Sequence, residues 1–166
     1  SGEDLFSQGS LSVTEGIKAI QKLFDQTDSR LIFHDMKFTY KVLRHNGLKC
    51  LEESDTSLSF FDTMIASWLL DPEELGNNPY ALDILAEKKL AILKTEYDEI
   101  VSKDNSLKDA DQKDLAQYIG ERPVITLALY KKLNALIKKF YKEKLFNEME
   151  LPLIPILSEM ELRGIH

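Results

Sequence analysis

The short apolar run Leu31–Phe33 restricts the possible folds of this chain, because helical patterning stands on both sides of it. Before it, Ser12–Glu15 fits an S-x-x-E capping box, and apolar residues at helical spacing predict a helix over residues 13–25. After Asp35, helical spacing resumes and stops at Gly47, a residue suited to the left-handed end of a helix. So short an apolar run is typical of a strand covered on both faces, which favours an α/β fold.

A second strand and helix are expected downstream. Residues Leu58–Phe61 form another apolar run, and we expect Asp62 to cap the following helix rather than to bind metal. That helix carries Trp68, which we expect in the core, and the Asp71–Pro72 pair ends it. Residues 79–90 predict one more helix.

The last third of the chain is helical in pattern. Residues 111–141 favour a helix interrupted at Pro123, and helical patterning returns over residues 143–163 until Gly164. Six lysines in this part are the best candidates for phosphate contact, and the interpretation we favour for them is a solvated helix face. They are Lys131, Lys132, Lys138, Lys139, Lys142 and Lys144.

Charge and cysteine content exclude several classes of protein. With 21 Lys and Arg against 28 Asp and Glu, the net charge of -7 gives the chain as a whole no basic field for nucleic acid. The single Cys50 cannot form an internal disulfide, and neither it nor His34 belongs to a zinc-type cluster. No apolar run approaches the roughly 20 residues that span a bilayer. We therefore expect an intracellular, cytoplasmic protein that has no membrane partner.

Three stretches, in order, carry a resemblance to a known family. They are HDMKFTYKVLRHNGL, then FFDTMIASWLLDP followed by LDILAEKKL, and then YIGERPVITLALYKKL running into EMELPLIPILSEMELRGI. Together they resemble the 3′–5′ exonuclease (proofreading) domain of family A DNA polymerases, the group of bacterial DNA polymerase I. The resemblance implies an RNase H-like (DnaQ-like) α/β fold, N-terminally incomplete here. It also implies a partial exonuclease-like domain over residues 1–141 and a helical C-terminal extension over residues 142–166, similar to the lead-in to the polymerase thumb.

In active members of that family, four carboxylates hold two divalent ions, Mg²⁺ or Mn²⁺, around the scissile phosphate. The first two carboxylates form a D-x-E pair on a strand. Asp71–Pro72–Glu73 has this spacing, but its proline and its position at a helix end give it the composition of a turn. We expect the strands that carry the pair to precede this chain.

Two further ligand positions hold residues of the wrong charge. Where relatives have Gln-Asn-Leu-Lys-Tyr-Asp, the stretch HDMKFT places the neutral Thr39 at the metal-binding aspartate and Asp35 at the asparagine. Where relatives have Tyr-x-x-Glu-Asp, Tyr118 and Glu121 match, and Arg122 stands at the ligand position. A hydroxyl lacks the charge that offsets dehydration of a divalent ion, and an arginine repels the ion.

The resemblance therefore predicts a degenerate proofreading site, with Thr39 and Arg122 as lost positions and Asp35, Tyr118 and Glu121 as remnants. We expect the domain to hold no metal or cofactor. Its expected role is that of a structural platform in a polymerase that acts in DNA replication or repair in the bacterial nucleoid.

Two alternatives stay open beside this interpretation. An active two-metal 3′–5′ exonuclease would bind Mg²⁺ or Mn²⁺ through the relocated ligands Asp35 and Glu121. Upstream strands would complete its metal site. A pure interaction module would use its acidic surface and C-terminal helices to hold a partner without binding DNA. In the favoured interpretation, DNA is reached through the parent polymerase, whose polymerase domain follows His166.

Overall fold

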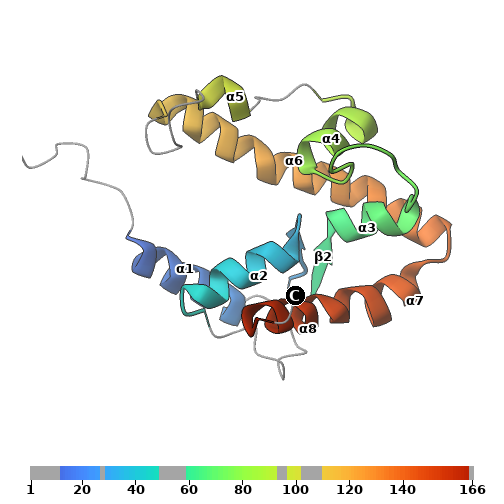
Figure 1. Cartoon of the computed structure of the whole chain (residues 1–166), viewed down its shortest axis with the longest axis horizontal. Helices are drawn as coiled ribbons and strands as arrows, with labels where there is room; N and C mark the ends of the chain where they lie inside the picture. The colour runs from blue at the N-terminus through green and yellow to red at the C-terminus, as the bar shows by residue number, and fades with distance from the viewer. Residues whose placement is uncertain (1–11, 27–28, 49–58, 93–96, 102–109, 165–166) are drawn as a thin grey trace, which may run out of the picture. The chain divides into compact units, whose positions relative to one another are not determined.

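The structure is a computed structural model that describes residues 12–26, 29–48, 59–92, 97–101 and 110–164 (Figure 1). Strands and helices alternate at first, and helices follow. The elements are α1 (Val13–Gln26), β1 (Leu31–Phe33), α2 (Met36–His45), β2 (Phe60–Asp62), α3 (Thr63–Leu70), α4 (Leu82–Leu85), the π-helical η1 (Ala86–Leu90), α5 (Tyr97–Ile100), α6 (Gln112–Lys139), α7 (Glu143–Leu145), the π-helical η3 (Phe146–Glu150) and α8 (Leu151–Leu162).

The chain divides into two compact units. Unit 1 consists of Ser1–Leu31, Met36–Ser59 and Leu153–His166, and unit 2 consists of Ile32–Asp35 and Phe60–Pro152. Among the described residues, no helix has both the length and the apolar character needed to cross a membrane.

The elements predicted at the start of the chain are confirmed. Ser12 donates its backbone N–H and its hydroxyl to the Glu15 carboxylate, at 2.9 and 2.7 Å, which closes the capping box at the start of α1. Gly47 follows α2 with a φ of +89°. The prediction that the strand Leu31–Phe33 is covered on both faces is wrong: β1 is half-buried, because in the described part of the chain it pairs only with β2 in a two-stranded sheet.

Unit 2 packs around Phe61 of β2. Its ring is fully buried and lies 4.9 Å from the ring centroid of Tyr130 and 4.8 Å from that of Phe146. Helix α3 packs along α6, and Asp62 is its N-cap: the Asp62 carboxylate accepts from the backbone N–H of Met64 at 2.7 Å. The predicted capping role of Asp62 is thus confirmed, and the aromatic contacts fix the strand that precedes α3.

Three expectations for the middle of the chain need correction. Trp68 is 39% exposed rather than in the core, because the buried side of α3 is formed by its neighbours Ala66, Ser67 and Leu69. Helix α6 continues through Pro123, whose ring lies on the exposed side, and burial of α6 further along compensates for the one missing N–H. The helix expected over residues 79–90 begins only at Leu82.

In unit 1, the buried carboxylate of Glu159 joins α8 to α2. It accepts a hydrogen bond from the Tyr40 hydroxyl at 2.8 Å and one from Arg44 Nε at 3.1 Å. Glu159 and Tyr40 are 9% and 1% exposed, so this contact is largely shielded from water. The buried hydroxyl and the buried carboxylate thus provide each other with a hydrogen-bond partner.

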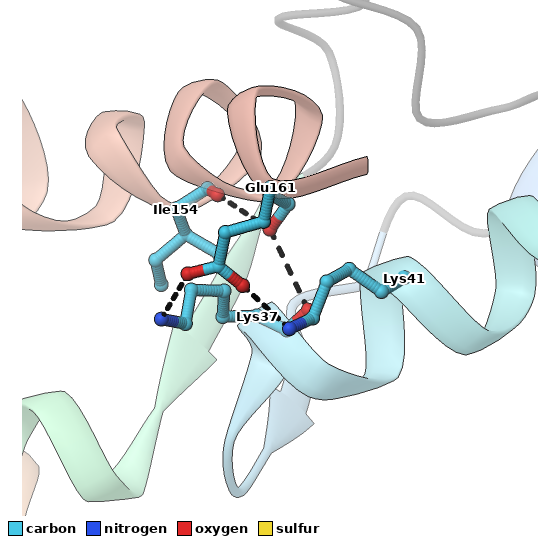
Figure 2. A network of polar contacts seen from close by, with 5 residues as sticks. Lys37, Lys41, Ile154 and Glu161 are labelled. Carbon is cyan, nitrogen blue, oxygen red and sulfur yellow. Dashed lines mark hydrogen bonds and ion pairs between the residues drawn. The ribbon is translucent and has the colours of Figure 1, made fainter. Parts of the chain in front are cut away.

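Glu161, on the same helix, binds two further cations of α2. Figure 2 shows its carboxylate between Lys37 and Lys41, which approach to 2.8 and 2.5 Å. Hydrogen bonds from these lysines lower the pKa of Glu161 to about 2. We call the whole set the α2–α8 network: Lys37, Tyr40, Lys41, Arg44, Glu159 and Glu161.

Candidate functional site

The arginine at a predicted ligand position of α6 meets a carboxylate. Arg122 Nη1 lies 3.3 Å from Asp83 Oδ1, and Nη2 lies 3.2 Å from Oδ2, so the guanidinium and the carboxylate meet fork to fork. Asp83 stands in the first turn of α4. Both side chains are 28% exposed, so the pair is only partly screened by water.

Arg122 also covers an aromatic ring. Its Cζ lies 3.8 Å from the ring centroid of Tyr118, one helical turn earlier, and Tyr97 of α5 approaches the same ring edge-on at 6.2 Å between centroids. Burial raises the pKa of the Tyr118 phenol, and the positive charge of Arg122 works against that shift. The structure thus brings together two of the predicted site residues, Tyr118 and Arg122.

His34, directly after β1, is electrostatically coupled to the same pair. Its Nδ1 lies 2.8 Å from the Thr63 hydroxyl, which itself donates to the Phe33 carbonyl at 3.1 Å. Burial lowers the pKa of His34 to about 4; nearby carboxylates oppose this shift, and the charge of Arg122 adds to it. The imidazole is therefore neutral at pH 7. We call His34, Asp83, Tyr97, Tyr118 and Arg122 the Arg122 cluster.

The other predicted residues lie elsewhere. Glu121 accepts a hydrogen bond from the side-chain amide of Gln117 at 2.9 Å, one turn earlier on the same helix. Asp35, between β1 and α2, adopts a φ of +57° and acts on His34 through its charge. Thr39 is half-buried on α2 and belongs to unit 1, whereas the Arg122 cluster belongs to unit 2.

Sequence patterns do not single out Asp83 or Tyr97. Asp83 lies in the LDILAEKKL stretch, and only the structure shows that Arg122, 39 residues later, is partly buried against it. Tyr97 lies in a stretch without helical or strand periodicity, so no local signal points to it.

These side chains do not fit a pair of divalent ions. Across residues 12–164, wherever the structure describes them, no three His, Cys, Asp or Glu side chains gather closely enough to hold a metal ion. Both oxygens of Asp83 are engaged by the guanidinium of Arg122. Mg²⁺ and Mn²⁺ need several anionic oxygens, whereas the Arg122 cluster offers one neutralised carboxylate.

Comparison with known proteins identifies the class of this domain. A family model described as 3′–5′ exonuclease matches residues 2–138. The chain is 30% identical over 150 residues to DNA polymerase I of Borreliella burgdorferi, covering 90% of this chain and 15% of that protein. It is 30% identical over 146 residues to DNA polymerase I of Treponema pallidum, covering 88% of this chain and 14% of that protein.

The chain therefore belongs to the 3′–5′ exonuclease family found in DNA polymerase I, and the resemblance seen in its sequence is confirmed. It spans about 15% of the length of these curated relatives. The family implies an RNase H-like fold. The described residues, mostly helical with a two-stranded sheet, agree with that fold in part. Members of this family generally use divalent metal ions. The expected domain boundary at residue 141 stays a prediction.

Proposed function

We propose that this chain is the exonuclease-like domain of a family A DNA polymerase that has lost its nuclease chemistry and kept its fold as a structural platform. The observation that carries the proposal is the pair of Arg122 and Asp83. A guanidinium stands where the resemblance assigns a metal-binding carboxylate, and a neighbouring carboxylate neutralises it.

Electrostatics opposes metal binding at this place. A divalent ion near Arg122 meets a like charge and must compete with a bidentate guanidinium for Asp83. Thr39, at the second changed position, supplies a hydroxyl that does not offset the cost of dehydrating the ion. Because the two changes lie on different helices, α2 and α6, restoring the metal site requires both to be reversed.

The residues that stabilise the fold are separate from the lost ligands. In unit 2 the packing rests on Phe61, Tyr130 and Phe146, and in unit 1 α8 is joined to α2 through Glu159 and Glu161. Replacing clustered carboxylates also removes mutual repulsion, so the platform can persist without its chemistry. In this proposal, DNA is bound through a polymerase domain of the same protein, in replication or repair.

Release of 3′ nucleotides from end-labelled single-stranded DNA tests the proposal. The complete gene product that carries this chain is assayed in Mg²⁺ and then in Mn²⁺, beside the variant Thr39→Asp/Arg122→Asp. The expected result is no release by the natural protein in either ion. Activity gained by the double variant would show in addition that only ligands were missing.

The opposite result has a clear form. Release by the natural protein that Asp35→Ala or Glu121→Ala abolishes would overturn the platform proposal and assign those two residues as relocated ligands. Lys113→Ala serves as the matched control, because Lys113 is an exposed residue of α6 outside the Arg122 cluster.

A further inference from the structure

A short turn joins α6 to α7 (Figure 1). Two aromatic side chains of this turn, and two lysines just before them, are exposed. Tyr141 is 93% exposed and Phe140 is 55% exposed. Lys138 and Lys139, in the last turn of α6, are exposed as well. We call residues 138–141 the basic aromatic turn. Its aromatic side chains contribute little to the core of unit 2.

The backbone of this turn holds Tyr141 in an unfavourable conformation. The N–H of Tyr141 donates to the Lys138 carbonyl at 3.1 Å and that of Lys142 to the Ile137 carbonyl at 3.0 Å, which is the Schellman ending of a helix. This ending places Tyr141 at a φ of +55°, where glycine is the preferred residue. Because Tyr141 is almost fully exposed, burial does not offset this cost.

Two of the six C-terminal lysines donate hydrogen bonds to backbone carbonyls of other elements. Lys132 donates to the Lys89 carbonyl at the end of η1, and Lys142 donates to the Leu69 carbonyl at the end of α3, at 2.6 Å. The solvated-face interpretation is therefore too simple for these two. Lys142 also anchors the basic aromatic turn to α3, so the lysines and aromatic residues before it project from a fixed backbone.

We propose that the basic aromatic turn binds single-stranded nucleic acid, with Lys138 and Lys139 against phosphates and Tyr141 stacked on a base. Lysines beside an exposed aromatic ring are the combination by which proteins hold unpaired strands, because every base offers a face for stacking. Residues 131–144 hold six lysines and one glutamate, against a net charge of -7 for the chain. Membership of an exonuclease family favours a nucleic-acid strand over other anionic partners.

This proposal goes beyond the platform role and is independent of it. The basic aromatic turn shares no residue with the Arg122 cluster, so strand binding can hold or fail whatever the nuclease assay shows. A single strand is favoured over a duplex because a stacked base must leave its pairing partner.

Fluorescence anisotropy of a labelled oligothymidylate of about twelve nucleotides, titrated with the full chain at about 50 to 200 mM salt, tests the site. Lys138→Ala/Lys139→Ala should reduce the slope of log affinity against log salt by about 1.4, since each phosphate contact contributes about 0.7. Tyr141→Gly should weaken binding at least about fivefold at every salt concentration and leave the slope unchanged.

Tyr141→Gly has an exposed counterpart for control. Ala91, after η1, also has a φ of +55° at a helix end. Both Tyr141→Gly and Ala91→Gly should raise Tm by relieving the backbone, but only Tyr141→Gly should weaken strand binding. Equal oligothymidylate affinity for the natural chain and Tyr141→Gly would overturn the proposal. So would binding to phosphatidylserine vesicles in the absence of oligothymidylate binding.

Discussion

The Arg122 cluster of unit 2 and the α2–α8 network of unit 1 use the same interaction, a cation against a carboxylate, in different settings. In the network, two carboxylates of α8 meet three cations and a tyrosine of α2, and two helices are joined. In the cluster, one arginine meets one carboxylate at a position that the family resemblance assigns to metal binding. An ion pair alone therefore does not distinguish a structural contact from a replaced metal ligand. The proposed loss of nuclease chemistry rests on the position of Arg122 in the family pattern.

The two regions also differ in how they respond to acid, and the largest effect is expected at His34. Its pKa is about 4 in the folded chain and near 6.5 when unfolded, so the unfolded state binds more protons between these values. The full contribution to stability is present above pH 6.5, and about 3 kcal/mol of it is lost as the pH falls to 4. The variant His34→Asn keeps a polar side chain beside Thr63. Its free energy of unfolding, measured by urea denaturation, should change less between pH 6.5 and pH 4 than that of the natural chain.

His45, an exposed histidine of α2, offers the control for that experiment. His45→Asn should preserve the pH dependence of the natural chain. A His34→Asn chain that loses stability as steeply as the natural one would mean that His34 is not buried neutral.

In unit 1, Glu159→Ala should destabilise the chain by about 2 kcal/mol, because it removes the carboxylate that accepts from the buried Tyr40 hydroxyl and from Arg44 Nε. Urea denaturation measures the loss. The control is Glu148→Ala, since Glu148 is 63% exposed and lies 4.0 Å from Lys144. Equal losses for the two variants would show that the α2–α8 network is not buried in solution.

The pair in the Arg122 cluster is more exposed, so we expect a smaller energy. A double-mutant cycle with Arg122→Ala and Asp83→Ala should give a coupling energy of about 1 kcal/mol. Zero coupling would remove the observation that carries the proposed function.

The smallest effect is expected at Glu161. Its pKa is lowered from 4.5 to about 2, so the contribution is complete above pH 4.5 and is lost as the pH falls through 2. Glu161→Gln should flatten stability only below pH 4.5, whereas His34→Asn acts between 4 and 6.5. If both variants changed stability over the same pH range, the two regions would not differ in their response to acid as we expect.

Local signals predicted the elements well. The capping box at Ser12, the left-handed stop at Gly47 and the cap at Asp62 each depend on residues within a few positions, and each is confirmed. Motif positions carried by the family resemblance likewise pointed to Tyr118 and Arg122, which lie in contact.

Features that depend on distant partners were not predictable. The exposure of Trp68, the continuity of α6 through Pro123 and the half-burial of β1 depend on which surfaces pack against each element. Asp83 meets Arg122 from 39 residues away, and no local pattern encodes that meeting.

Anomalous scattering from crystals of the complete gene product, grown with Mn²⁺ and single-stranded DNA, tests most directly whether arginine has replaced a metal ligand. We predict no manganese peak beside the Arg122 cluster and a guanidinium still bound to both oxygens of Asp83. A manganese ion coordinated there by Asp83 or Glu121, with Arg122 turned away, would contradict it.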